Sequence, residues 1–168
     1  GGLAGLLREN SKINVYGLSR FSSSFKEKVK NSGAKLIEEN KFTQIMPNIY
    51  LTGEMATCYG NSPLSEESLI IRANPGLVII TGCSHPGIIK IIEKVKKNLP
   101  EPIYLVVGGF HLMDKDERLV DIIVKKFREL EVSKVAPTHC TGDKPIEMFK
   151  KEYKENFIEA GAGKTIVV

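Results

Sequence analysis

The sequence contains three histidines, and each one directly follows a run of apolar residues. They are His85, His111 and His139, separated by 26 and 28 residues. Imidazole is a common ligand for zinc and iron and a common general acid or base. Each histidine has a glycine within three residues, which lets the backbone turn sharply and leaves room for a ligand. The pattern predicts a metal or catalytic site built from these side chains.

Other side chains near the histidines could complete such a site. Cys83 and Cys140 would add soft sulfur ligands beside two of the histidines. Carboxylates usually contribute to catalytic metal sites, and the candidates are Asp114, Asp116, Asp143 and Glu54. The pattern favours helix capping for Asp114 and Asp116 and a surface turn for Asp143. Glu54 lies in a predicted long loop and is a remoter candidate.

Alternating strands and helices must position the histidines. The apolar runs Leu77–Thr81 and Ile103–Val107 are typical of strands buried on both faces, and Lys134–Ala136 is predicted as a third strand. Between them, apolar residues recur at helical spacing. Because such crossovers join parallel strands, the three histidines should lie together at the carboxyl ends, the edge where open α/β sheets bind ligands.

The rest of the chain shows weaker patterns. Helices are predicted from Ser24, which has capping-box spacing, to Asn31 and over Ile146–Phe157. Ser68–Arg72 should form a hairpin with Leu77–Thr81, and residues 52–65 a long loop. Further strands are predicted at Ile13–Tyr16, Lys35–Glu38, Asn48–Leu51 and Thr165–Val168. The class is therefore α/β, or a closely related α+β layered sandwich.

Composition excludes several classes of protein. A chain of 168 residues with 42% hydrophobic residues suits one compact domain. The net charge of +4 comes from scattered lysines, which argues against nucleic acid as a partner, and no apolar run could span a membrane. Three cysteines and no visible signal peptide indicate a reducing, cytoplasmic setting. One glutamine against 19 lysines hints at a thermophile.

Several motifs together resemble the metallo-β-lactamase superfamily. The motifs are Leu77–Gly87, Val106–Leu112, Ala136–Gly142, Asn48–Glu54 and Gly161–Lys164. The most similar branch is that of the 7,8-dihydropterin-6-methyl-4-(β-D-ribofuranosyl)aminobenzene-5′-phosphate synthases, which are linked to methanopterin biosynthesis. The likeness extends over nearly the whole chain and is more specific for the superfamily than for a substrate.

The resemblance implies an αββα sandwich with one or two divalent metals at one edge, zinc first and iron or manganese as alternatives. In the superfamily an H-x-H-x-D-H motif precedes a helix that begins Gly-Gly-Leu. This sequence starts with Gly1–Leu3 and lacks the motif. It therefore resembles the carboxyl-terminal two-thirds of such a protein, and we expect residues 1–168 to form a single incomplete domain whose amino-terminal part is missing.

Residue roles follow from the resemblance. His139 matches the late histidine ligand of the metal. Cys83 stands where many relatives have the aspartate that bridges two metals, and His85, two residues on, is favoured over Cys83 as the ligand. His111 matches an active-site histidine, for which a general acid or substrate-contact role is as open as metal ligation.

The implied function is a metal-dependent, hydrolase-type enzyme acting on a phosphorylated or pterin-like small molecule. The alternative is a catalytically inactive scaffold or binding fragment without the main metal motif. If the amino-terminal half is missing, the sheet face that carries Leu77, Ile79 and Val106 should be uncovered. That half or a second copy of the chain would then cover it.

Overall fold

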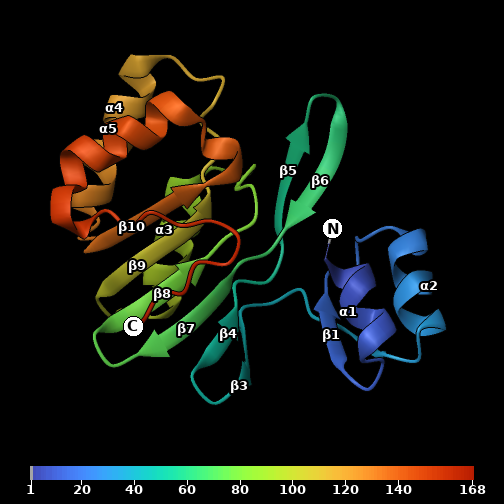
Figure 1. Cartoon of the computed structure of the whole chain (residues 1–168). Helices are drawn as coiled ribbons and strands as arrows, with labels where there is room; N and C mark the ends of the chain where they lie inside the picture. Colours follow the sequence, from blue (N-terminus) through green and yellow to red (C-terminus); the bar gives the residue numbers. More distant parts are fainter. Residues whose placement is uncertain (1) are drawn as a thin grey trace.

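A six-stranded sheet forms the centre of the computed structural model, which describes residues 2–168 (Figure 1). Its strand order is β10-β9-β8-β7-β4-β3. Strands β8, β9 and β10 are parallel, as predicted, and the other neighbours are antiparallel. The bounds are β3 Thr43–Met46, β4 Ile49–Leu51, β7 Leu69–Ala73, β8 Gly76–Ile80, β9 Ile103–Gly109 and β10 Lys134–Thr138.

Three helices cover one face of this sheet. They are α3 (Ile88–Asn98), α4 (Glu117–Glu129) and α5 (Asp143–Tyr153). Leu77, Ile79 and Val106 pack under them and are fully buried, so the prediction that this face is uncovered is wrong. These three residues lie on the helix-covered face and not on the face that was expected to be uncovered. Successive side chains along a strand point to opposite faces, so the residues one position away lie on the other face.

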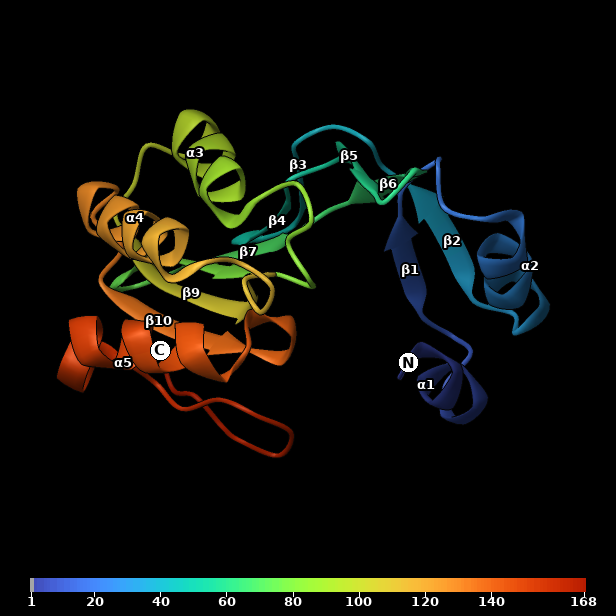
Figure 2. The same cartoon turned by 90° about the horizontal axis from the view of Figure 1, so that it is seen from above.

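The opposite face carries Val78, Leu105 and Ala136, which are also buried. Ile158 and Ile166 of the C-terminal segment, residues 157–168, pack against it. Figure 2 shows α3 and α4 above the sheet and this segment below it. Within residues 2–168, the two other sheets have two strands each, so the large sheet is the only broad layer there.

The predicted strand at Thr165–Val168 is wrong. The C-terminal segment follows the 3-10 turn at Lys154–Asn156 and joins the sheet only through a bridge between Val135 and Phe157. The Ile158 N–H donates to the Val135 carbonyl at 2.8 Å. Beyond that point the chain packs its apolar side chains on the sheet face and forms no backbone ladder.

The first part of the chain forms a smaller layer of its own. It comprises α1 (Leu3–Glu9), β1 (Asn14–Gly17), α2 (Ser23–Asn31) and β2 (Lys35–Glu38), with β1 and β2 parallel. Its apolar cluster contains Leu7, Val15 and Val29. The hydroxyl of Ser22, and not the predicted Ser24, caps α2 by accepting from the Phe25 N–H.

The predicted long loop contains a hairpin, β5 (Met55–Tyr59) paired with β6 (Ser62–Glu66). The hairpin projects away from the six-stranded sheet (Figure 1). None of the residues in its two strands is buried, so its sequence lacks the alternation of apolar and polar residues that marks a half-buried strand. Among residues 2–168, no helix is long and apolar enough to cross a membrane.

Candidate active site

The three histidines lie at the carboxyl ends of adjacent parallel strands, as predicted. His85 follows β8, His111 follows β9, and His139 opens the 3-10 turn His139–Thr141 that follows β10. This is the edge of the sheet where the loops of α/β folds build binding sites.

The structure brings two of the three histidines together. The ring centroids of His85 and His111 are 4.4 Å apart. The ring of Tyr59, from the end of β5, lies edge-on to both, at 4.9 Å from His85 and 5.9 Å from His111. We refer to His85 and His111 as the histidine pair.

Two glycines at the end of β9 permit the close approach of strand ends around this pair. Gly108 has a φ of +131°, and a Cβ there would lie 2.3 Å from the Thr81 carbonyl oxygen. A Cβ on Gly109 would lie 2.7 Å from the Cys140 Sγ. Ser84 in the loop after β8 and His111 in the loop after β9 both have positive φ. The Ser84 hydroxyl donates to the Gly109 carbonyl at 2.6 Å. Non-glycine residues with positive φ are strained and cluster at functional sites.

The histidine pair lines a cavity of about 680 Å³. Apolar side chains form much of its wall, including Ile89, Phe110, Leu112, Leu119 and Ile123. Lys90 and Lys115 add positive charge, and Asp114 and Glu93 add negative charge. An apolar cavity with a few convergent polar groups is the usual form of a small-molecule site.

His139 does not join the histidine pair. It is exposed and lines a separate cavity of about 390 Å³ together with Met113, Gly142 and Lys144. The loop after His111 lies between the two cavities, because Asp114 lines the first, Met113 the second and Lys115 both.

Burial sets the protonation of two site residues. Desolvation, reinforced by the nearby His85, lowers the pKa of His111, and its Nδ1 is buried without a hydrogen-bond partner. Desolvation and the neighbouring Cys140 thiol raise the pKa of Cys83 to about 11. His111 is therefore mainly a neutral imidazole at pH 7, and Cys83 a neutral thiol.

Three of the four candidate carboxylates have structural partners instead. Asp116 caps α4 by accepting from the Leu119 N–H at 2.9 Å, as predicted. Asp114 pairs with Lys115, and Asp143 is exposed in the first turn of α5. Glu54 pairs with Arg20 and accepts from the Ser65 hydroxyl.

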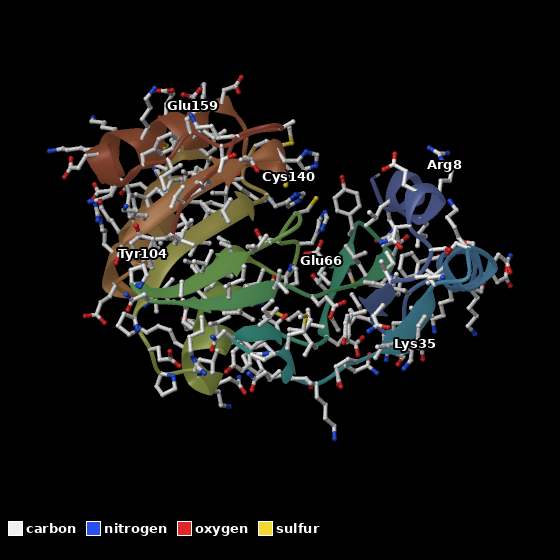
Figure 3. The ribbon with its side chains drawn as sticks, turned by 60° about the horizontal axis from the view of Figure 1, so that its bottom comes forward. Arg8, Lys35, Glu66, Tyr104, Cys140 and Glu159 are labelled. Atoms are coloured by element: carbon white, nitrogen blue, oxygen red, sulfur yellow. The ribbon has the colours of Figure 1, made fainter. Side chains whose placement is uncertain are left out.

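Sequence reasoning missed Glu66, whose carboxylate contacts the His85 ring at Nδ1. Glu66 ends β6, and Figure 3 shows it toward the same edge of the sheet as Cys140, which follows β10. The available signal was a pair of acidic residues, Glu66 and Glu67, directly before a strand.

The superfamily implied by the motifs suggests a divalent metal, and the donors present do not fit a complete centre. Among residues 2–168, no three His, Cys, Asp or Glu side chains are grouped so that they could hold a metal ion. His139 lines a different cavity from His85. Metal ligation by His85, His139 and Cys83 therefore stays a prediction.

Comparison with known proteins agrees with the resemblance. No protein-family model matches the chain. A 7,8-dihydropterin-6-methyl-4-(β-D-ribofuranosyl)-aminobenzene-5′-phosphate synthase of Methanocaldococcus jannaschii is 30% identical over 206 residues, covering 99% of this chain and 70% of the relative. MJ0448, an uncharacterised protein of the same organism, is 40% identical over 89 residues, or 53% of this chain and 33% of its own length.

A solved structure shows the same fold. Tm1679, described as a metal-dependent hydrolase of the β-lactamase superfamily, superposes with a TM-score of 0.78 and 30% identity, covering 96% of this chain and 73% of that chain. The chain belongs to the metallo-β-lactamase superfamily. Within it, the chain falls in the branch of the 7,8-dihydropterin-6-methyl-4-(β-D-ribofuranosyl)aminobenzene-5′-phosphate synthases.

Proposed function

We propose that the chain provides the substrate-binding and acid–base residues of a metallo-β-lactamase-fold enzyme that acts on a phosphorylated, pterin-like small molecule in methanopterin biosynthesis. The observation that carries the proposal is the histidine pair in the wall of the 680 Å³ cavity. A cavity of this size accommodates a cofactor-sized molecule. The name of the M. jannaschii relative describes a compound with a pterin, an aminobenzene ring and a ribose phosphate, which supports this substrate class.

The lining of the cavity suits such a molecule. Leu119 and Ile123 offer apolar surface to flat rings, and Tyr59 offers an aromatic edge at the rim. Lys90 and Lys115 would offset the charge of a phosphate. His111 lines the cavity, and as a mainly neutral imidazole it would exchange a hydrogen bond or a proton with the polar edge of the substrate.

A divalent metal would supply an activated water or polarise a phosphate or carbonyl oxygen. Zinc is the first candidate, with iron or manganese as alternatives, and His85, His139 and Cys83 are the proposed ligands. Because these side chains do not form one group in residues 2–168, such an ion needs further donors or a rearranged edge.

The alternative function is a binding scaffold without catalytic activity. The absence of a three-donor group among residues 2–168 favours this alternative. It keeps the cavity and the substrate class and differs only in the lack of turnover. Metal content, measured by mass spectrometry after dialysis against zinc, iron or manganese, together with turnover of a phosphorylated pterin, separates the two functions.

Calorimetric titration tests the substrate class. The probes are 6-hydroxymethylpterin and ribose 5-phosphate, each added to the protein with and without zinc. We expect both to bind, and His111→Ala to weaken pterin binding about tenfold, the effect of one lost hydrogen bond of about 1.4 kcal/mol. Without zinc, His139→Ala, in the other cavity, should change it less than about twofold. If the wild-type chain binds neither probe under either condition, the proposed function is wrong.

A further inference from the structure

Glu66 holds His85 at two points. One carboxylate oxygen contacts the Nδ1 of the His85 ring, and the other accepts a hydrogen bond from the His85 backbone N–H at 3.0 Å. The two side chains are 19% and 16% exposed, so the contact is largely shielded from water. A contact to both the ring and the backbone of one residue restricts the rotation of that ring.

The rest of the hairpin adds two contacts to the same histidine. The Thr57 hydroxyl, from β5, donates to the His85 carbonyl oxygen at 3.4 Å. The Tyr59 ring packs edge-on against the imidazole. Strands β5 and β6 therefore contact the backbone N–H, the carbonyl and the ring of a residue that lies on the loop after β8.

We infer that Glu66 is a positioning residue that keeps the Nδ1 of His85 protonated and so leaves Nε2 as the ring nitrogen with a free lone pair. An ionised carboxylate only accepts hydrogen bonds, so the nitrogen it contacts must carry the hydrogen. In a neutral imidazole the other nitrogen is then the acceptor. His85 would then accept a hydrogen bond from an N–H or O–H group of the substrate.

This inference uses the cavity of the proposed function as the active site, but the protonation pattern of His85 does not depend on which molecule binds there. The adjacent residue provides a matched control. Glu67 is also a glutamate; burial raises its pKa to about 7, and its Oε2 is buried without a hydrogen-bond partner. The carboxylate contacts to His85 come from Glu66.

Nitrogen-15 NMR of the histidine rings tests the inference directly. Two-bond proton–nitrogen spectra at pH 8 distinguish the two neutral forms of imidazole from the charged form, and the His85 signals are assigned by their loss in His85→Gln. In the wild-type chain and in Glu67→Gln we expect the Nδ1–H form. In Glu66→Ala we expect that form to be lost and replaced by the Nε2–H form that free histidine prefers. Glu66→Gln offers one acceptor oxygen where the carboxylate offers two, and its NH2 group would face the ring when that oxygen accepts from the His85 backbone N–H, so it should also reduce the Nδ1–H form.

The wild-type spectrum decides the question even if Glu66→Ala fails to fold. An Nε2–H form or a doubly protonated ring in the wild-type chain overturns the inference, as does an unchanged Nδ1–H form in a folded Glu66→Ala chain. Glu66→Met, which has a similar length and no oxygen, replaces the alanine variant if needed.

A measurement of 6-hydroxymethylpterin binding distinguishes a failure of the positioning role from a failure of the proposed function. Glu66→Ala should weaken it about fivefold or more, and Glu67→Gln should leave it unchanged. If the Nδ1–H form switches as expected but the wild-type chain binds no pterin, the proposed function fails and the positioning role stands. If pterin binds and Glu66→Ala weakens neither its binding nor the Nδ1–H form, the positioning role fails.

Discussion

The ends of β8 and β9 and the end of β10 carry the same pattern of strand, turn and histidine, yet they build different environments. The ring centroids of His85 and His111 lie 4.4 Å apart beside a cavity of about 680 Å³. His139 is exposed beside a cavity of about 390 Å³. The difference comes from neighbours outside the pattern, because Glu66 and Tyr59 of the hairpin contact the first site.

The loop after His111 separates the two environments. Leu112 donates its N–H to the Cys140 carbonyl at 3.2 Å, which ties this loop to the end of β10. Asp116 then starts α4. A repeated motif at one sheet edge therefore does not by itself make one site, since a connecting loop can divide the edge into two cavities.

The largest expected loss of stability comes from a substitution that blocks the close approach of β8 and β9 beside the histidine pair. Gly108→Ala places a Cβ 2.3 Å from the Thr81 carbonyl oxygen at a φ of +131°. The contact can relax only if β8 moves away from β9, and the φ stays unfavourable for alanine, so we expect a loss of about 3 kcal/mol in the free energy of unfolding, measured in urea.

Gly82→Ala is the control at the same edge, because nothing lies within 4 Å of its added Cβ. It should change the free energy of unfolding by less than about 0.5 kcal/mol. Equal losses in the two variants would show that the end of β9 does not constrain the site.

A smaller loss of stability is expected from a substitution at the start of α4, directly after the loop between the two cavities. Asp116→Ala removes the side chain that caps α4, and N-cap substitutions of this kind cost about 1 kcal/mol. Thermal unfolding measures the change. Asp114→Ala is the control, since Asp114 is exposed and pairs only with its neighbour Lys115 among the contacts described. A larger loss for Asp114→Ala would contradict this assignment.

The smallest effect concerns the protonation of His111. Its pKa in the folded chain lies below the ordinary value of 6.5, chiefly through desolvation. The unfolded chain therefore binds the proton more readily, so this contribution to stability is complete above pH 6.5 and is lost as the pH falls through the lower folded-state pKa.

Urea unfolding at pH 8 and pH 5 checks this sign. The wild-type chain should lose more stability between the two pH values than His111→Gln, which cannot titrate. A steeper loss in His111→Gln would mean that the ring is stabilised in its charged form.

Much of the central fold could be predicted because its elements are buried. The apolar runs that became β8, β9 and β10 and the helical spacing of Ile88, Ile91, Ile92 and Val95 reflect burial directly. The exposed hairpin and the short edge strand β3 bury little, so their sequences carry no comparable pattern. The resemblance to the superfamily, carried by the motifs at the strand ends, could also be found in the sequence and is confirmed.

The sequence by itself determined the parallel strands, the covering helices and the sheet edge where His85, His111 and His139 lie. Local periodicity and strand–helix spacing are sufficient for that, because crossovers between parallel strands have one favoured hand. Only the tertiary structure decided that His85 meets His111, that Glu66 binds His85 from 19 positions earlier in the chain, and that His139 faces elsewhere. Beyond a strand end, the direction of a side chain depends on loop dihedrals and on contacts with distant segments, which no local pattern encodes.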